Sequence, residues 1–153
     1  MIDSIEASVG IYLATLIVSV LSGLVPVVNG EVYLAAAILV ADDPAVALVL
    51  AVLVAVGQMI AKIGLYHAAL GATRLGRSTR LGDKLARAQE LAHRWRNKPL
   101  TVLFVSAVTG LPPFYLVSLC ADVLQIRFVT FLVLGLAGRL IRFVALALVV
   151  LYW

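Results

Sequence analysis

Charged residues are scarce in this 153-residue chain. They make up 13% of the sequence, whereas 63% of the residues are hydrophobic. Soluble domains contain about a quarter charged residues and about half apolar ones. The chain therefore has too few polar side chains to cover a soluble surface, and its composition indicates an integral membrane protein. We treat residues 1–153 as one domain.

Cysteine is nearly absent, and the motifs of common enzymes are missing. Cys120, the single cysteine, excludes an internal disulfide and lies in an apolar stretch, which predicts a packing role. There is no Gly-rich phosphate loop, no His-Glu-x-x-His motif and no nucleophile elbow. His67 and His93 lack the neighbouring ligands of a metal site. We therefore expect no enzyme activity, no cofactor and no metal.

Positive charge is concentrated in one segment. Eight of the twelve Lys and Arg residues lie between Arg74 and Lys98, and long apolar runs flank this segment. Basic loops of membrane proteins face the cytoplasm, so we place residues 74–98 there. We expect no nucleic-acid partner, because aromatic residues are sparse in the segment.

The same segment predicts an amphipathic helix. Apolar residues at helical spacing share one side, namely Leu81, Leu85, Ala88, Ala92 and Trp95. Basic residues lie mostly elsewhere, namely Arg80, Lys84, Arg87 and Arg94. Such a helix lies at the membrane surface and is attracted to anionic lipid. The alternative is that these charges only fix the topology, and the two interpretations are compatible.

Proline and glycine interrupt two of the apolar runs. Pro26 breaks the first run, and Gly110 with Pro112 and Pro113 breaks a later one. Proline removes a backbone donor and clashes with the preceding helical turn. The freed backbone groups cannot face lipid, so each break lies within protein or against a watery cavity. We expect hairpins that enter and leave the membrane on one side.

The expected fold is all-α, with two opposed re-entrant hairpins, each followed by a transmembrane helix. The elements are a hairpin over residues 9–41, a helix over 44–72, the basic segment over 74–98, a hairpin over 99–126 and a helix over 128–152. Asp42, Asp43 and Pro44 suit a turn and a helix start between the first two elements. The competing interpretation makes residues 9–28 a full span, with the amino terminus inside.

The two halves of the sequence match each other. Residues 23–26 resemble residues 110–113, and residues 56–60 resemble residues 137–141. Broken segments at corresponding places in two halves are typical of a transporter repeat whose site lies at the breaks. The odd number of crossings in each half makes the repeats inverted.

Ionisable residues at membrane depth cost about 2.5–3.5 kcal/mol each on insertion scales, so each is a candidate site residue. Glu31 follows the first break, where burial would let it gain and lose a proton. Arg139 lies in the middle of the last run, and its planar fork suits phosphate. Arg142 is one turn away and could share that phosphate. The alternative is structural, with Arg139 bonded to Glu31 or Asp122.

Three further polar residues complete the candidate set. Gln58 corresponds to Arg139 in the repeat and is a candidate binding residue. Asp122 stands at the exit of the second hairpin, where binding and structural roles are both open. We expect Lys62, one turn after Gln58, to extend its amine to the interface.

The second break resembles a known family. The run Gly110-Leu111-Pro112-Pro113-Phe114-Tyr115-Leu116-Val117-Ser118, followed by Phe128, Phe131 and residues 138–143, resembles the VTT domain of the DedA superfamily. Residues 26–31 are similar to its first re-entrant loop, in which a Pro and a Gly-Glu pair, here Gly30-Glu31, are typical. The resemblance covers roughly residues 20–145. It implies two opposed re-entrant hairpins, shaped by these Pro and Gly residues.

The resemblance also implies a function. Bacterial members are implicated in flipping undecaprenyl phosphate or phosphatidylethanolamine, and eukaryotic relatives behave as lipid scramblases. We therefore expect a flippase or scramblase of the bacterial inner membrane that binds a phosphate-bearing lipid, with proton coupling and homo-oligomerisation both open. One alternative is a small-solute or ion transporter on the same fold. The other is a non-transporting scaffold that acts through the basic helix.

Overall fold

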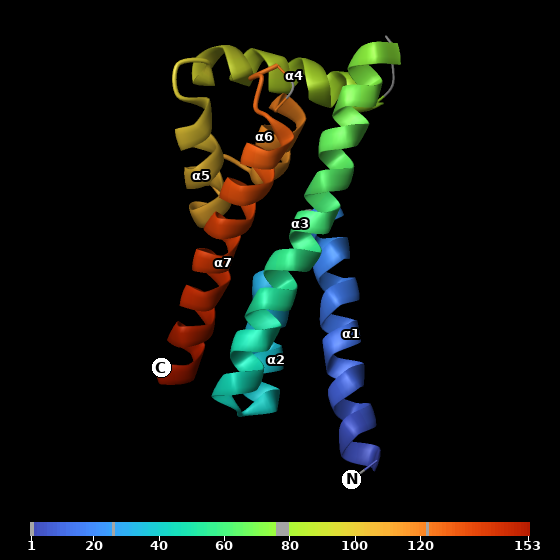
Figure 1. The fold of residues 1–153 in the computed structure, drawn as a ribbon, viewed down its shortest axis with the longest axis vertical. Helices are drawn as coiled ribbons and strands as arrows, with labels where there is room; N and C mark the ends of the chain where they lie inside the picture. Colours follow the sequence, from blue (N-terminus) through green and yellow to red (C-terminus); the bar gives the residue numbers. More distant parts are fainter. Residues whose placement is uncertain (1, 26, 76–79, 122) are drawn as a thin grey trace. The chain divides into compact units, whose positions relative to one another are not determined.

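The computed structural model describes residues 2–25, 27–75, 80–121 and 123–153, and these residues form seven α-helices and no strand. The helices are α1 (Ile2–Leu24), α2 (Gly30–Ala41), α3 (Pro44–Leu75), α4 (Arg80–Trp95), α5 (Pro99–Thr109), α6 (Phe114–Cys120) and α7 (Phe128–Tyr152) (Figure 1). Two of them, over Pro44–Gly71 and Phe128–Tyr152, are long and apolar enough to cross a membrane. The predicted all-α class is confirmed.

The chain divides into two compact units. One contains residues Met1–Ala61 and Leu140–Trp153, and the other contains Lys62–Arg139. The first unit holds the helix pair α1–α2, and the second holds the pair α5–α6 together with α4. Each unit also includes one part of α3 and one part of α7.

Local side-chain chemistry sets the helix ends of the first unit. Asn29 caps α2, because its side chain accepts a hydrogen bond from the Glu31 backbone N–H at 3.0 Å. After α2, Asp42 adopts a left-handed conformation with φ 49°. The Asp43 side chain then accepts a bond from the Ala45 N–H at 2.7 Å, and α3 begins at Pro44. The predicted turn and helix start are confirmed, whereas Pro26 lies outside the described residues.

Glycines let α1 and α3 approach closely. A Cβ placed on Gly57 of α3 would lie 2.6 Å from the Ser19 Cβ of α1. A Cβ on Gly23 of α1 would lie 2.6 Å from the Ala61 Cβ. Small residues allow helix backbones to pack at short range in a membrane, where water exclusion does not drive association. This part of the first unit is therefore held by close backbone packing.

The break between α5 and α6 is where the sequence predicts it. Gly110 ends α5 in a left-handed conformation with φ 79°, and its N–H donates to the Ser106 carbonyl at 2.9 Å. The Ser106 hydroxyl donates to the Pro112 carbonyl, and the Leu111–Pro112 peptide is cis. The turn ends at Pro113, and α6 begins with Phe114. The positive φ explains why glycine occupies position 110.

The second unit repeats the close packing of the first. A Cβ on Gly138 of α7 would lie 2.5 Å from the Ala107 Cβ of α5. Gly57 and Gly138, which match in the sequence repeat, thus each meet the first helix of a helix pair. The correspondence between residues 56–60 and 137–141 therefore extends to packing.

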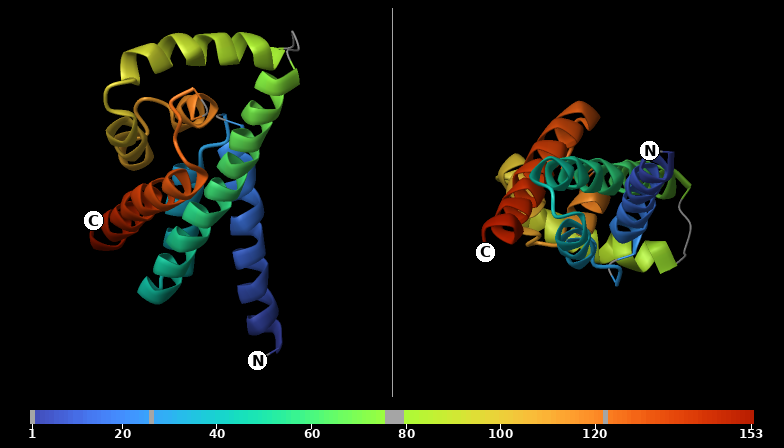
Figure 2. Two further views of the ribbon diagram at one scale, coloured as in Figure 1. Left: turned by 45° about the horizontal axis from the view of Figure 1, so that its top comes forward. Right: turned by 90° about the horizontal axis from the view of Figure 1, so that it is seen from below.

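The apolar face of α4 packs on protein. Ala88 and Ala92 are buried with Cys120 of α6 and Ala69 of α3, and Trp95 packs against this cluster. The Cys120 thiol donates to the Ala88 carbonyl at 2.9 Å. Figure 2 shows α4 running across α6. The predicted amphipathic helix thus turns its described apolar residues toward protein, because small alanines let α6 reach the α4 backbone.

The outer face of α4 agrees with the sequence prediction. Arg87 and Arg94 are exposed, whereas the side chains of Arg80 and Lys84 are outside the described part of the structure. Positive charge therefore lies on the side of α4 that does not carry the buried alanines. This arrangement leaves Arg87 and Arg94 accessible to an anionic surface.

Cys120 provides a test of the α4–α6 packing. We expect a maleimide to modify Cys120 about 100-fold more slowly than a cysteine at the exposed position Gln89 in a Cys120→Ala background, because a buried thiol reacts only when the helices separate. Labelling rates followed by mass spectrometry give the comparison. Equal rates would contradict the packing of α4 on α6.

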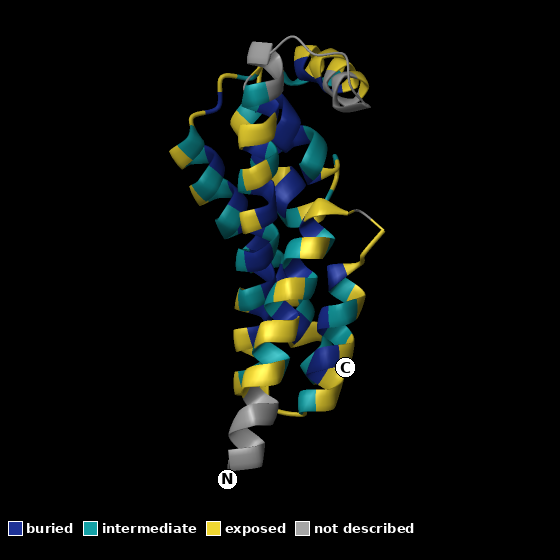
Figure 3. Ribbon diagram, turned by 90° about the vertical axis from the view of Figure 1, so that its right-hand side faces the viewer, coloured by how far each residue is buried: buried dark blue, intermediate teal, exposed yellow. Residues whose placement is uncertain are grey.

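Large apolar side chains cover the outer surfaces of both units. Buried and exposed residues share the helices in Figure 3, and the exposed ones on α1 form a stripe at four-residue spacing, Val9, Leu13, Ile17 and Leu21. Val129 and Val133 of α7 and Val40 of α2 are also exposed. A soluble protein rarely exposes such continuous apolar surface. These surfaces and the two long apolar helices are consistent with a helical membrane protein.

Candidate functional site

Arg139 is buried against the start of α6. The residue is 6% exposed, and its guanidinium carbon lies 4.5 Å from the centre of the Phe114 ring. Phe114 follows Pro113 directly, so the break between α5 and α6 determines where the ring lies. A cation over an aromatic face is stabilised by about 2 kcal/mol when desolvated. The break and the mid-span arginine, both predicted from the sequence, thus come together.

Lys62 is a second buried cation in the same unit. It is also 6% exposed, and it lies close enough to Arg139 for the two charges to repel. The expectation that its amine extends to the interface is wrong. Two positive charges in an apolar interior are costly to bury, and both side chains make further interactions within the protein. The sequence feature that could have indicated the burial of Lys62 is its position one helical turn after Gln58, the residue that matches Arg139 in the repeat.

Aromatic side chains line this unit beside the cations. The rings of Phe114 and Phe131 are 5.7 Å apart, and those of Phe131 and Tyr66 are 5.0 Å apart. The Tyr66 hydroxyl donates to the Ile126 carbonyl at 3.1 Å, which satisfies its polar group. His67 packs on Phe128, and the centres of their rings are 5.3 Å apart. This wall lowers the local dielectric and strengthens any interaction that Arg139 makes.

Glu31 and Arg142 form a salt bridge in the first unit. The Glu31 side chain is 38% exposed and the Arg142 side chain is 29% exposed. Burial was expected for Glu31, and the structure instead leaves it partly exposed. The structural alternative considered for Glu31, an ion pair, is the contact observed, although its partner is Arg142 rather than Arg139. The Arg142 guanidinium is thus engaged by a carboxylate, whereas Arg139 stacks on an aromatic ring.

A double-mutant cycle tests the ion pair. We expect Glu31→Gln and Arg142→Gln to destabilise the protein less in combination than the sum of the single effects, with a coupling of about 0.5–1 kcal/mol. The small value follows from the partial exposure of both side chains. Thermal unfolding in detergent measures each variant, and strictly additive effects would show that the pair contributes nothing.

Gln58 reaches the first helix pair as Arg139 reaches the second. Its side-chain nitrogen donates to the Ser22 hydroxyl at 3.0 Å. A Cβ on Gly30 would lie 2.6 Å from that same nitrogen, so Gly30 leaves room for the Gln58 side chain at the start of α2. In each unit, therefore, the residue after the packed glycine directs a polar side chain at the helix pair.

The remaining candidates lie outside this arrangement. Asp122, predicted to bind substrate or a proton, lies outside the described residues. Arg127 is exposed just before α7. Asn29, which the sequence analysis did not single out, caps α2 beside Glu31 and fixes the backbone there. Its position before a Gly-Glu pair is a recognisable capping signal.

Comparison with known families agrees with these features. The family model described as the VTT domain matches residues 25–152, which is most of the chain. No curated protein and no solved structure gives a significant match. The matched range begins after α1 and includes α2, the pair α5–α6, both long apolar helices and the cations Lys62 and Arg139. On this evidence, the chain belongs to the VTT-domain family of membrane proteins, the family that its second break resembles.

Proposed function

We propose that the protein moves a phosphate-bearing lipid across the membrane, as a flippase or scramblase, with Arg139 at the centre of its site. The observation that carries this proposal is the burial of Arg139 beside Lys62, against an aromatic ring at a helix break. An ionisable residue held at membrane depth marks a pathway for substrate or ions by default. Undecaprenyl phosphate and phospholipids are the substrate classes that fit.

The charge of the headgroup is what makes lipid translocation slow. A phosphate loses its hydration in the hydrocarbon region, at a cost of several kcal/mol per ion even after relaxation. The guanidinium of Arg139 offers parallel hydrogen bonds that match phosphate oxygens, and Lys62 supplies a second positive charge. The protein would therefore replace part of the lost hydration while the acyl chains stay in the bilayer.

The lengths of α2 and α5 support a re-entrant arrangement of each helix pair, although the 23 residues of α1 would by themselves be long enough to cross the membrane. At 1.5 Å per residue, the 12 residues of α2 and the 11 residues of α5 extend about 18 Å and 16 Å. The hydrocarbon core is about 30 Å thick, so neither helix crosses it alone. We infer that residues 9–41 and 99–126 are hairpins inserted from opposite sides, in inverted repeats.

The same proposal gives Glu31 a role in coupling. Protonation of Glu31 would remove the negative partner of Arg142 and free that guanidinium for substrate. A proton-driven cycle could then alternate between a paired and an unpaired Arg142. Passive scrambling would leave translocation independent of the pH gradient.

Topology and assembly complete the proposal. The basic segment, residues 74–98, would face the cytoplasm of a bacterium, with the other helices in its inner membrane. The protein would move its lipid without changing it, and a homo-oligomer would thicken a wall built from few membrane elements. Recovery of the transported lipid in chemically unchanged form would support the first of these statements. Cross-linking of two copies of the chain would support the second.

Proteoliposomes test the function directly. The purified protein is reconstituted, and translocation of undecaprenyl phosphate and of a phospholipid is followed beside uptake of inorganic phosphate. Accelerated translocation of either lipid over protein-free vesicles supports the proposal. Uptake of inorganic phosphate without lipid movement would favour the small-solute transporter, and no transport of any kind would favour the scaffold.

A further inference from the structure

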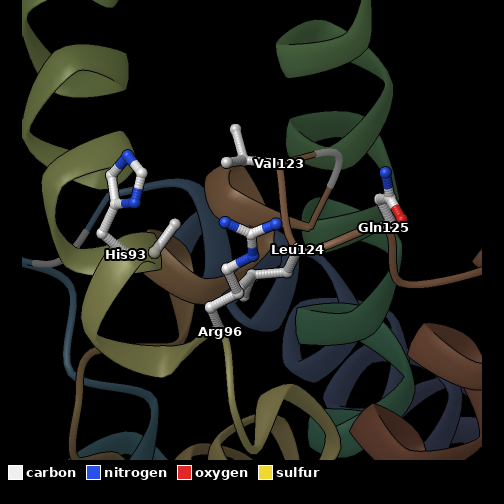
Figure 4. A pocket seen from close by; sticks show the side chains of 6 residues that line it. His93, Arg96, Val123, Leu124 and Gln125 are labelled. Atoms are coloured by element: carbon white, nitrogen blue, oxygen red, sulfur yellow. The ribbon is translucent and has the colours of Figure 1, made fainter.

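Two pockets meet at the turn that connects α6 to α7. The first, of about 310 Å³, is lined by residues at the end of α4 and by the turn, namely Ala92, His93, Arg96, Val123, Leu124 and Gln125 (Figure 4). The second, of about 260 Å³, is lined by Pro99, Leu100, Leu124, Gln125, Ile126, Arg127 and Thr130. Leu124 and Gln125 line both, so the two pockets adjoin at these two residues.

The first pocket is suited to an anionic group. Figure 4 shows the Arg96 guanidinium projecting between His93 and Leu124, with Gln125 on the side away from His93. These three polar side chains are all exposed, so a ligand can reach them. None of the described residues that line either pocket is acidic. Arginine and an amide offer several donors to phosphate oxygens.

The turn between the pockets holds Gln125 in an unusual backbone conformation. Its φ is 53°, in the left-handed region that few residues other than glycine adopt. Backbone bonds fix the turn on both sides: the Leu124 N–H donates to the Cys120 carbonyl, and the Ile126 N–H donates to the Ala121 carbonyl, both at 2.9 Å. The turn thus holds Gln125 at the junction of the two pockets.

The second pocket differs in chemistry from the first. Pro99, Leu100, Leu124 and Ile126 supply an apolar lining, and Arg127 and Thr130 supply the polar atoms. A polar cationic pocket joined to a mainly apolar one matches a molecule with an anionic head and a hydrocarbon chain. A soluble phosphate would use only the first pocket and would leave Leu100, 47% exposed, uncovered.

We infer that these joined pockets bind an anionic phospholipid, with its phosphate at Arg96 and the beginning of an acyl chain over Leu100 and Ile126. This site is separate from Arg139 and does not depend on lipid transport. It uses residues at the end of α4 and in the connecting turn, whereas the general attraction of the basic helix for lipid would involve all its arginines alike. The bound lipid would attach α4 to the turn.

Calorimetric titration of the detergent-solubilised full chain tests this site. The probes are dihexanoyl phosphatidic acid, dihexanoyl phosphatidylcholine, glycerol phosphate and inorganic phosphate. We expect phosphatidic acid to bind about tenfold more tightly than each of the others, because it alone joins an anionic head to chains. Arg96→Gln should weaken that binding about tenfold, and Leu100→Gln should weaken it for the lipid but leave inorganic phosphate unchanged.

Arg87→Gln is the matched control, because it removes the same charge from an exposed position of α4, the helix that Arg96 directly follows. We expect a change below about twofold there, since salt screens a charge outside the pocket. Equal losses for Arg87→Gln and Arg96→Gln would overturn the site in favour of general electrostatic attraction. Equal affinities for phosphatidic acid and inorganic phosphate would overturn the lipid assignment. Circular dichroism and elution volume confirm that each variant is folded.

Discussion

Arg139→Ala is expected to slow lipid translocation in proteoliposomes about 10- to 100-fold. A hydrogen bond to a charged group contributes about 1.5–3 kcal/mol, and the substitution removes a planar guanidinium that can make two parallel hydrogen bonds to phosphate oxygens. On the proposed function the headgroup would meet Arg139 at a buried position and not in water, so solvent would not replace the lost bonds. The initial rate of translocation, measured at equal protein density, gives the factor.

Two further variants separate charge from geometry. Arg139→Lys keeps the positive charge but loses the planar fork and the stacking on Phe114, so we expect a rate between those of the wild type and Arg139→Ala. Arg87→Ala removes an exposed arginine from α4 and should leave the rate unchanged within error. A wild-type rate for Arg139→Ala, with the protein folded, would remove Arg139 from the pathway.

Where local chemistry determines the backbone, the structure follows the sequence. Gly110 is the residue that accepts a φ of 79°, and Pro112 and Pro113 cannot continue α5, so the break could be located from the sequence alone. Asp43 and Pro44 likewise determine the start of α3. Arg139 could be singled out because a charge in a long apolar run has few structural explanations.

The side-chain partners could not be derived in the same way. Whether Glu31 pairs with Arg139 or with Arg142 depends on how α7 is rotated about its axis relative to α2. The two arginines lie one helical turn apart, and the sequence pattern does not indicate which of them faces Glu31. Lys62 has a long side chain, so the same position permits burial or extension to the interface. The spacing of Ala88 and Ala92 predicts an apolar face, but lipid and α6 are equally apolar, and only the fold distinguishes them.

Gly57→Leu and Gly138→Leu are expected to prevent stable folding, and the corresponding alanine variants should be destabilised. At both positions an added Cβ would lie within 2.6 Å of a neighbouring Cβ, on Ser19 and Ala107, respectively. Overpacking costs about 1–3 kcal/mol, which exceeds the gain of up to about 1 kcal/mol in helix propensity from glycine to alanine. Melting temperature and monodispersity in detergent measure the effect.

Gly64 provides the matched control, because it lies in α3 like Gly57 but has no atom within 4 Å of an added Cβ. Gly64→Ala should therefore be neutral or slightly stabilising, and a loss as large as that of Gly57→Ala would show that helix flexibility, not close packing, is what matters.

Relief of the contact gives the sharper test, since Ala107→Gly removes the atom that an alanine at position 138 would meet. The remaining neighbours there, the Ala107 carbonyl carbon and the Phe104 carbonyl oxygen, are both 3.3 Å away and require only a small shift. The double variant should recover most of the stability that Gly138→Ala loses. Ser19→Gly should likewise restore stability to Gly57→Ala. Recovery at both sites would show that the same kind of glycine contact stabilises each unit internally, as expected of a repeat.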